Sequence, residues 1–336
     1  MKTKKHIVII GGGTGTFTLL KGLHSFPIKI SVIVSTADSG GSTGVLRNEL
    51  GVMPPGDLRQ CLLGLSQADP LLQHLFGYRF DRGFLEGHTI GNIILAGLER
   101  ITGSSEAAVR EASRLLKVHG SVVPVTKKPT TLIAILENGR RIVGEHFIDE
   151  PRHDGTLRIR SLVLTPSGSA NPDALRLIKT ADAIVFGPGD LFTSTLPNII
   201  VDGMAQAIRS SRAKKILVTN IMTKYGQTHG FTASDFLTTL EQYLTTKIGE
   251  KIIDTVIVNT KTPPQSVLVK YKKEHALPVV ADKHELARRG AAVITGDFLS
   301  RDPIKKQMGD ELKRSMLRHD SVKTARAIVS CLKRYP

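Results

Sequence analysis

The feature that most constrains the fold is a change from an apolar run to a glycine-rich turn near the start of the chain. Residues 8–23 read VIIGGGTGTFTLLKGL, in which an apolar segment stops at four glycines and two threonines and an amphipathic segment follows. A continuous apolar run is typical of a strand buried on both faces, as in a parallel sheet. The segment therefore predicts a strand, a loop and a helix, which together begin a βαβ unit.

The same alternation continues along most of the chain. Strand-like apolar runs occur within residues 6–12, 29–38, 181–190, 214–223, 252–260 and 277–300. Helical segments separate them, at residues 16–25, 57–67, 88–102, 105–120, 196–211, 232–248 and 320–336. Strands that alternate with helices form parallel βαβ units. The sequence thus predicts an α/β fold with a Rossmann-like, doubly wound, mostly parallel sheet.

Residues 121–165 differ from this alternation. The segment TLIAILENGRRIVGEHFI, residues 131–148, predicts two strands joined by a turn at Asn138 and Gly139. Residues 157–165 predict a further strand. We therefore expect a small antiparallel β insert at about residues 121–165. Because no linker rich in Pro, Gly or Ser divides the chain, we expect one domain over residues 1–336.

The glycines of the first loop, residues 11–16, remove side chains where a phosphate would approach the backbone. Thr14 and Thr16 could add hydroxyl donors. The spacing does not fit the dinucleotide-binding fingerprint, because its third glycine position falls on Thr16. No lysine of the P-loop type follows the loop either. The loop therefore indicates a phosphate site of another kind, with a tight turn that binds nothing as the alternative.

The second loop, residues 35–44, reads STADSGGSTG and follows the next strand. Its glycines and hydroxyls, among them Gly40, Gly41 and Ser42, predict a second anion site beside the first. Two neighbouring sites suit a diphosphate, or a phosphate together with a sugar. Asp38 could hold Mg²⁺, accept a hydrogen bond from a ligand hydroxyl, or cap the turn.

Two further motifs offer candidate residues. In MPPGDLRQ, Asp57 is placed as the N-cap of the next helix or as an acid aimed at the same cleft. Arg59 could bind a phosphate or lie on the surface. In GHTIGN, His88 and Asn92 are four residues apart and share one face if the segment is helical. His88 could contact a ligand or act as a general acid, or it could be a core residue.

Later strand ends repeat the pattern. Residues 185–198 read VFGPGDLFTSTLPN and follow a strand. The candidate ligand-binding residues in this third loop are Gly187, Gly189, Thr193, Ser194 and Asn198. Residues 218–232, the fourth loop, contribute Asn220 and Thr223. Each loop alone could be ordinary, but together they predict one cleft at the carboxyl ends of the strands that binds a large polar ligand.

The composition limits the classes of function. The chain has 46 Lys and Arg against 30 Asp and Glu, and residues 251–336 have 18 against 9. Such an excess can indicate nucleic-acid binding, but the chain has no Trp and no groove-reading motif, so we do not expect a nucleic-acid partner. No apolar run approaches the ~20 residues that span a bilayer. The two cysteines form no metal or redox motif, and we expect a cytoplasmic protein.

Together the motifs resemble the YvcK family, often called gluconeogenesis factors. That family is related to CofD, the 2-phospho-L-lactate transferase of coenzyme F420 synthesis. The motifs that carry the resemblance are GGGTG, D-x-GGS-x-G, PPGD-x-R, GH-x-x-GN, GPG-x-x-x-TS-x-x-PN, N-x-MT and a late RHD, in that order. The resemblance spans nearly the whole chain.

The resemblance implies a Rossmann-like fold that binds UDP-sugars such as UDP-N-acetylglucosamine or UDP-glucose, with links to carbon metabolism, cell shape and peptidoglycan synthesis. It implies that the first loop holds the ligand through Gly12, Gly13, Thr14 and Gly15. Asp38 and Asp57 match the acids that serve metal and acceptor in the transferases. The resemblance also makes Asn220 and Arg318 candidate contacts to the nucleotide sugar.

The chain departs from the family's pattern at three places. Ser39 follows Asp38 where the family commonly reads DDGG, and the loss of one acid weakens a metal-assisted transferase interpretation. Asp190 stands where a serine is usual, and we expect it to face a sugar or solvent because a carboxylate repels a phosphate. The segment MTKYGQTHG, residues 222–230, replaces MTQPGET, which leaves the identity of the sugar open.

These observations predict a UDP-sugar-binding regulatory protein that requires no cofactor. We expect a homo-oligomer and a regulatory protein partner of unknown identity. The alternative is a CofD-like transferase that moves a phospholactyl-type group from a nucleotide diphosphate donor, with Mg²⁺ at Asp38 and Asp57. An NAD(P)-dependent oxidoreductase is disfavoured because the dinucleotide fingerprint is absent.

Overall fold

The centre of the molecule is a seven-stranded sheet whose strands all run parallel. The structure, a computed structural model, describes residues 4–247, 249–301 and 316–332. The strands lie in the order β10-β9-β8-β7-β1-β2-β3. Their bounds are β1 His6–Ile10, β2 Lys29–Val34, β3 Ser121–Pro124, β7 Ala183–Phe186, β8 Lys214–Val218, β9 Thr255–Asn259 and β10 Ala292–Gly296. The predicted α/β fold with a mostly parallel sheet is confirmed.

The direction in which the chain adds strands reverses at β1. From β1 the chain builds β2 and β3 outward on one side, and it later returns to place β7 on the other side. Ile10 is thus paired with Ile33 of β2 and with Phe186 of β7. In open α/β sheets, ligands bind outside the carboxyl ends of the strands at such a reversal point. The topology therefore directs the search for a site to the loops that follow β1 and β7.

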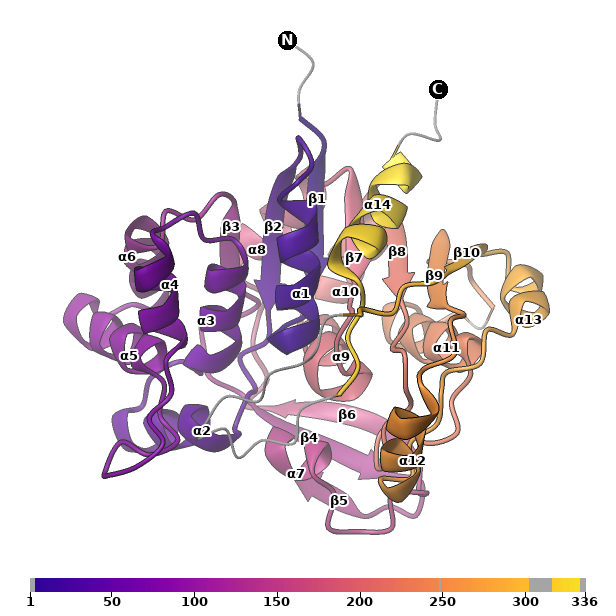
Figure 1. The fold of residues 1–336 in the computed structure, drawn as a ribbon, viewed down its shortest axis with the longest axis horizontal. Helices are drawn as coiled ribbons and strands as arrows, with labels where there is room; N and C mark the ends of the chain where they lie inside the picture. The colour runs from indigo at the N-terminus through magenta and orange to yellow at the C-terminus, as the bar shows by residue number, and fades with distance from the viewer. Residues whose placement is uncertain (1–3, 248, 302–315, 333–336) are drawn as a thin grey trace.

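One face of the sheet is covered by α1 (Gly13–Leu23), α3 (Pro55–Gly64) and α14 (Ser321–Leu332), which stand in front of the sheet in Figure 1. Side chains of a strand alternate between its faces, so Ile7 and Ile9 of β1 pack with these helices. The helix α1 packs between α3 and α14. The start of α1, at the end of β1, is fixed by this packing.

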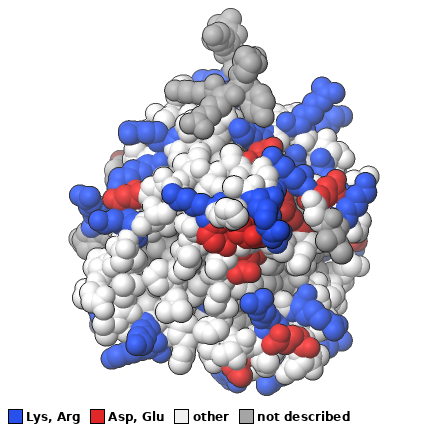
Figure 2. Space-filling view, turned by 90° about the vertical axis from the view of Figure 1, so that its right-hand side faces the viewer, with Lys and Arg blue, Asp and Glu red and all other residues white. Residues whose placement is uncertain are grey.

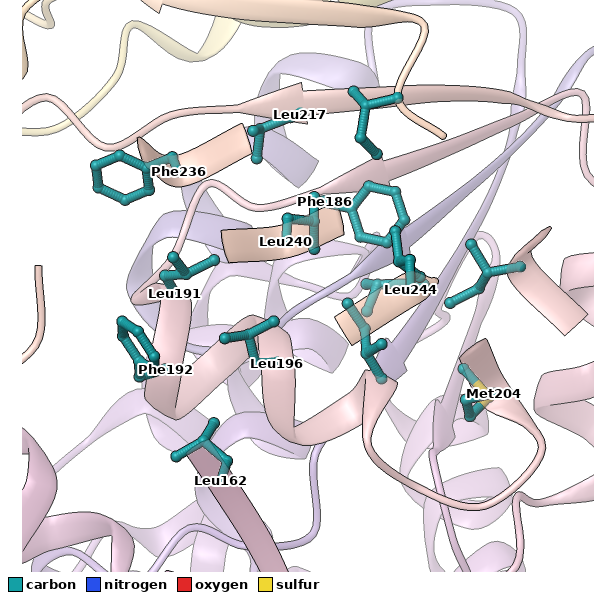
Figure 3. Close-up of a cluster of buried hydrophobic side chains, with 14 of the residues drawn as sticks. Leu162, Phe186, Leu191, Phe192, Leu196, Met204, Leu217, Phe236, Leu240 and Leu244 are labelled. Atoms are coloured by element: carbon teal, nitrogen blue, oxygen red, sulfur yellow. The ribbon is translucent and has the colours of Figure 1, made fainter. Parts of the chain in front are cut away.

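The opposite face packs against α8 (Pro172–Thr180), α10 (Met204–Ser210) and α11 (Ala233–Leu244). A short π-helical turn, η1 (Leu191–Thr195), continues into α9 (Leu196–Ile199). Figure 3 shows the buried side chains of this segment, Leu191, Phe192 and Leu196, between Leu162 on one side and the side chains of the sheet and α11 on the other. The third loop is therefore held by a hydrophobic core directly beneath it.

A three-stranded antiparallel sheet lies below the carboxyl ends of the parallel strands in Figure 1. It has the order β5-β4-β6, with β4 at Thr131–Leu136, β5 at Arg141–Val143 and β6 at Ile159–Thr165. The turn at Asn138 and Gly139 joins β4 to β5, as the sequence predicts. Residues 121–124, which the expected insert included, instead form β3 of the parallel sheet, paired with β2.

Other differences concern short elements. The segment EHFI, residues 145–148, was predicted to extend a strand, but it belongs to the five-residue helix α7 (Glu145–Asp149). The predicted helix at residues 196–211 is divided into α9 and α10, and residues 277–280 form no strand of either sheet. The remaining helices are α2 Gly41–Leu50, α4 Pro70–Gly77, α5 Ile90–Thr102, α6 Ser105–Leu115, α12 Gln265–Lys273 and α13 Lys283–Arg288.

The apolar character of the helices and the charges on the surface are relevant to two kinds of partner, a membrane and a nucleic acid. Among the described residues, no helix has both the length and the apolar character needed to cross a membrane. On the face shown in Figure 2, Lys and Arg side chains lie in separate groups, and Asp or Glu side chains adjoin several of them. That face therefore presents no single continuous basic stripe of the kind that follows a nucleic-acid backbone.

Candidate functional site

A cleft of about 730 Å³ lies at the carboxyl ends of the central strands. Its walls come from the first loop after β1, the second loop after β2, the third loop after β7 and the fourth loop after β8. Further lining residues come from residues 145–152, from the end of α12 and from residues 317–319. Residues 145–152 lie between β5 and β6 in residues 131–165, which we call the antiparallel unit. This is the size of cleft that encloses a drug-sized or nucleotide-sized ligand.

The first and third loops touch each other at the floor of the cleft. A Cβ added at Gly15 would lie 2.3 Å from the carbonyl oxygen of Pro188, which is closer than side-chain atoms come in folded proteins. Gly15 is therefore required for the two loops to pack. This contact joins the strands on the two sides of the reversal point.

Asp57 packs against the first loop from α3. A Cβ at Gly12 would lie 2.0 Å from Asp57 Oδ2, so Gly12 is required by this carboxylate. The N-cap of α3 is Pro54, and Asp57 lies in the first turn of the helix, so the prediction of Asp57 as the N-cap is wrong. Its side chain is directed instead toward the N-terminal end of α1, where the helix dipole favours a negative charge.

Gly13 is the glycine of the first loop with room beside it. Its φ is +69°, and the nearest atom to an added Cβ is Asp57 Oδ1 at 3.6 Å. Two of the four glycines that indicated a phosphate loop, Gly12 and Gly15, thus have a packing role. Gly13 has a positive φ, which glycine adopts without strain.

Asp38 of the second loop forms a local turn. Its Oδ1 accepts a hydrogen bond of 3.0 Å from the backbone N–H of Gly40. Burial raises the pKa of the Asp38 carboxyl, and the Gly40 and Thr43 donors oppose that rise only in part. Gly56 lies against Asp38 Oδ2 and Thr43. The second loop is therefore packed onto the start of α3, which brings Asp38 and Asp57 to the same wall.

Side chains from three sequence motifs form one buried network. Arg59 Nε donates to Asn92 Oδ1 at 2.8 Å, and Asn92 Nδ2 donates to Ser42 Oγ at 3.1 Å. His88 Nδ1 lies 3.0 Å from Ser42 Oγ. Arg59 is only 6 % exposed, so it is not a surface arginine. His88 precedes α5, whose N-cap is Thr89, so His88 and Asn92 do not share a helical face but meet at Ser42.

The third loop turns sharply into η1. The backbone N–H groups of Ser194 and Thr195 both donate to the carbonyl oxygen of Asp190, at 2.8 and 3.1 Å. The second of these bonds spans five residues, which is the π-helical pattern often found at functional sites. Asn198 Nδ2 donates to the carbonyl oxygen of Ser194 at 2.8 Å. Asn198 thus supports the loop from below, while Thr193 and Ser194 line the cleft.

The fourth loop is fixed by a reciprocal pair of hydrogen bonds. The N–H of Thr223 donates to the carbonyl oxygen of Leu277 at 2.7 Å, and the N–H of Leu277 donates to Thr223 Oγ1 at 2.9 Å. Asn220 and Lys224 line the cleft on either side of this contact. The loop is therefore anchored to the chain segment that follows α12.

Lys224 forms the centre of an ionic group that the sequence analysis did not identify. Its Nζ contacts Asp149 Oδ1 of α7 and lies 2.7 Å from Asp190 Oδ2. The two carboxylates raise the pKa of the Lys224 ammonium despite its burial. Asp190 also lines the cleft, and its side chain is 33 % exposed and paired with Lys224. The expectation that Asp190 faces a sugar or solvent therefore stays a prediction.

Glu145 was also missed. It lines the cleft, and its Oε2 accepts from the N–H of Ser39 at 3.4 Å. Burial raises the pKa of the Glu145 carboxyl well above its usual range, and the nearby carboxylates of Asp38, Asp149 and Asp57 raise it further. Asp38, Asp57, Glu145, Asp149 and Asp190 together form what we call the carboxylate cluster.

The sequence did carry a partial signal for these residues. Asp190 and Lys224 fall in two of the segments in which the chain departs from the family's pattern, and a new acid in one segment accompanies a new base in the other. Asp149 and Glu145 could not be identified in this way, because they lie on a five-residue helix that the sequence does not indicate and most of which was predicted as a strand.

Cationic side chains also line the cleft. Arg152 and Lys273 are exposed, while Arg79 and Arg318 are half-buried. These groups can bind an anionic ligand that the carboxylate cluster would repel. The cleft is thus lined by both cationic and anionic side chains.

Most of the predicted site residues are brought together. Those that line the cleft are Gly12, Gly13, Thr14, Gly15, Asp38, Gly40, Ser42, Asp57, Arg59, Asn92, Gly189, Thr193, Ser194, Asn220, Thr223 and Arg318. Those that do not are Gly41, Gly187 and Asn198, which lie in the same loops or next to them, and His88, which lies beside Ser42.

The transferase alternative implies a bound Mg²⁺, which would need ligands from side chains of the cleft. Among the described residues, no three His, Cys, Asp or Glu side chains are grouped so as to hold a metal ion. Mg²⁺, however, is usually held by one or two carboxylates together with substrate phosphates. Asp38 and Asp57 fit a Mg²⁺ site of that kind, to be completed by the ligand, and do not fit a site made by protein ligands alone.

Comparison with known proteins gives the family. Residues 7–299 match the family described as 2-phospho-L-lactate transferase CofD. The chain is 41 % identical to the gluconeogenesis factor of Bacillus subtilis over 335 residues, covering 99 % of this chain and 100 % of that protein. It is 40 % identical to the gluconeogenesis factor of Halalkalibacterium halodurans over 329 residues, covering 97 % and 96 %.

A solved structure agrees with this result. The crystal structure of a UPF0052 family protein from Bacillus halodurans superposes with a TM-score of 0.88 at 38 % identity, covering 98 % of this chain and 100 % of that chain. The match extends over both sheets and the cleft. The chain therefore belongs to the CofD family, in which it groups with the gluconeogenesis factors.

Proposed function

We propose that the protein binds a UDP-sugar, UDP-N-acetylglucosamine or UDP-glucose, and acts as a regulatory protein rather than as an enzyme. By the resemblance, its role lies in carbon metabolism, cell shape and peptidoglycan synthesis in the cytoplasm. The observation that carries the proposal is the cleft where the first and third loops meet, at the reversal point of the sheet.

The cleft offers groups that suit both the phosphates and the sugar of such a ligand. The diphosphate would be held by backbone N–H groups at Gly13 and Thr14 and by the cationic side chains, with Arg318 as one contact. Carboxylates accept hydrogen bonds from hydroxyls, so Asp38 would accept one from the sugar or the ribose. Asn220 would help to orient the base or the sugar.

Closure of the cleft around the ligand would be the signal. The antiparallel unit reaches the cleft through α7, and α7 contacts η1 and the fourth loop. A change in the position of α7 on ligand binding could therefore be read by a partner protein or by a second copy of the chain.

One observation favours the alternative, a Mg²⁺-dependent CofD-like transferase. Asp57 lies against Gly12, at the place where a phosphate would approach the first loop. A carboxylate there repels a phosphate unless a cation lies between them. Under this alternative, Asp38 and Asp57 would hold Mg²⁺, which would draw the phosphates of the nucleotide donor into the cleft.

The two functions are separated by one calorimetric experiment. The purified protein is titrated with UDP-N-acetylglucosamine in EDTA and in Mg²⁺, and the nucleotide is then recovered and chromatographed. Micromolar binding in both buffers, with the ligand recovered intact, is the result expected for the regulatory protein. Binding that requires Mg²⁺, or a ligand that is consumed, would support the transferase, and an absence of binding would reject both uses of UDP-N-acetylglucosamine.

A further inference from the structure

Lys224 joins three segments that are distant in the sequence. Its Nζ contacts Asp149 on α7 of the antiparallel unit and Asp190 at the start of η1, while Lys224 itself follows β8. The same Asp149 Oδ1 also accepts from Gln227 Nε2 at 3.1 Å and lies 3.4 Å from Thr193 Oγ1. The ammonium is thus held at a defined position inside the cleft.

The ammonium can still be reached from the cleft. The side chains of Lys224, Asp149 and Asp190 are 32 %, 27 % and 33 % exposed. An ammonium has three N–H groups, and the described contacts with Asp149 and Asp190 use two of them. Because Lys224 lines the cleft, the third N–H is available to an oxygen of a bound ligand.

The ammonium between two carboxylates resembles the arrangement in which a divalent cation commonly binds a phosphate. Mg²⁺ is held by one or two carboxylates and keeps its other positions for phosphate oxygens and water. Lys224 likewise bridges two carboxylates and keeps one donor for the ligand. The carbonyl oxygen of the Gln227 side chain, an oxygen of the type that binds such cations, lies on the amide group that contacts Asp149. Gln227 is 3 % exposed, and no described group donates a hydrogen bond to this oxygen.

We propose that Lys224 is a built-in counter-cation that takes the place of a divalent metal ion between Asp149 and Asp190, so that the cleft binds an oxyanion of its ligand there without a metal. The fixed ammonium neutralises the carboxylates on either side and keeps a divalent cation out by charge repulsion. The proposal deepens the proposed function and rests on it for the identity of the ligand. The exclusion of a metal is a separate property of these residues.

The first test uses Mn²⁺ alone and no nucleotide. Free Mn²⁺ is measured by electron paramagnetic resonance during titration of the wild type, of Lys224→Gln and of Lys272→Gln. Lys272 is an exposed lysine of α12 outside the cleft wall, so its variant controls for net charge. We expect Lys224→Gln to bind one Mn²⁺ at least tenfold more tightly than the wild type and Lys272→Gln. Equal affinities in the three folded proteins would overturn the proposal.

The position of the Mn²⁺ is checked with Asp149→Asn/Lys224→Gln, in which the gain in affinity is expected to disappear. A gain that persists there would place the metal elsewhere and reject the proposal. If Lys224→Gln does not fold, Asp190→Asn/Lys224→Gln removes the opposite charges together. That variant keeps Asp149 and is expected to bind Mn²⁺ more tightly than Asp149→Asn/Asp190→Asn/Lys224→Gln, which keeps neither carboxylate, and equal affinities of the two would count against the proposal.

A second test brings in the ligand. UDP-N-acetylglucosamine binding to Lys224→Gln is expected to become dependent on Mg²⁺, while binding to the wild type is the same in EDTA and in Mg²⁺. If neither protein binds the nucleotide but the Mn²⁺ result holds, the proposed ligand is wrong and the role of Lys224 stands. If Lys224→Gln binds the nucleotide as well in EDTA as the wild type does, the counter-cation is not used by the ligand and the proposal fails.

Discussion

The backbone of Gly15 lies against the carbonyl group of Pro188, so that a methyl group on Gly15 would be 2.3 Å from the carbonyl oxygen. Neither partner can move without displacing its loop, because η1 follows Pro188 closely and is fixed by its core, and Gly15 lies in the first turn of α1. The relative position of the first and third loops, and with it the floor of the cleft, depends on this contact.

Gly15→Ala is therefore expected to destabilise the protein. Forcing a methyl group into a closely packed contact costs about 2 kcal/mol, which chemical denaturation can measure. The control is Gly97→Ala in α5, where an added Cβ meets no atom within 4 Å. That change is expected to stabilise the protein by about 0.5–1 kcal/mol, because alanine favours a helix over glycine. Equal stability of Gly15→Ala and the wild type would mean that the two loops do not pack as described.

Gly13→Asp tests the first loop as a phosphate site. The position has φ +69°, and an added Cβ has its nearest atom at 3.6 Å, so a side chain fits without a collision. Asp and Asn tolerate this backbone conformation better than other side chains, which makes Gly13→Asn a matched control without charge. Calorimetry is expected to show that Gly13→Asp loses at least tenfold in affinity for UDP-N-acetylglucosamine and that Gly13→Asn stays within about threefold. Unchanged affinity in Gly13→Asp would remove the first loop from the phosphate site.

The central sheet could be predicted from the sequence because its strands are buried on both faces. Every residue of β1 is buried, and such a strand appears as a continuous apolar run that ends abruptly at glycine. The carboxyl ends of parallel strands lie at one edge, so the loops after them could be assigned to one cleft without knowing the strand order. Short elements could not be predicted as well, because a five-residue helix such as α7 has too few turns to show a helical period.

The roles of individual glycines could not be predicted in the same way. A glycine that lets a phosphate approach and a glycine that lets Asp57 or Pro188 approach are identical in the sequence. Only the structure shows that Gly12 and Gly15 belong to the second kind. The contact between Asp149 and Lys224 could not be predicted from the sequence either, because it depends on how the antiparallel unit is placed on the parallel sheet.

Asp57→Asn distinguishes the two candidate functions. If the first loop binds a phosphate without a metal, removal of the neighbouring negative charge is expected to raise the affinity for UDP-N-acetylglucosamine in EDTA about fivefold, the size of a like-charge repulsion of roughly 1 kcal/mol. The control is Asp154→Asn, an exposed acid outside the cleft wall, which is expected to leave the affinity unchanged. Loss of binding in folded Asp57→Asn, seen by calorimetry in Mg²⁺, would instead favour the transferase.

A double-mutant cycle measures the pairing of Lys224 with Asp190. Each single change, Lys224→Gln or Asp190→Asn, leaves a half-buried charge with fewer partners, whereas the double change removes both charges. Because both side chains are about one-third exposed, we expect a coupling free energy of about 1–2 kcal/mol, between the values for surface and for buried pairs.

The comparison pair for this cycle is Arg176 with Asp173 on α8, whose side chains are 70 % and 50 % exposed. Its coupling free energy is expected to be at most about 0.5 kcal/mol. Denaturant unfolding of the four variants of each cycle gives both values. A coupling for Lys224 and Asp190 no larger than that of the surface pair would contradict the description of this contact as a fixed, partly desolvated ion pair.

We expect the stability of the Glu145→Gln variant to depend on pH differently from that of the wild type. Burial, and then the carboxylates of Asp38, Asp149 and Asp57, raise the pKa of Glu145 above the unfolded value. The folded protein then holds the Glu145 proton more tightly than the unfolded chain does. The contribution of the Glu145 proton to stability is therefore complete below the unfolded pKa of about 4.3 and is lost as the pH rises through the folded pKa.

The glutamine variant cannot ionise, so it is expected to unfold at a higher temperature than the wild type at pH 8, with the difference shrinking toward pH 5. Asp182→Asn is the control of opposite sign. Burial tends to raise the pKa of Asp182, but donors from Lys5 and from the N–H of His6 outweigh it and lower that pKa. Asp182→Asn should therefore be less stable than the wild type at neutral pH, and the deficit should shrink as the pH falls through the acidic range. A Glu145→Gln difference that does not vary with pH would show that Glu145 is ionised throughout and that the carboxylate cluster is more hydrated than its burial indicates.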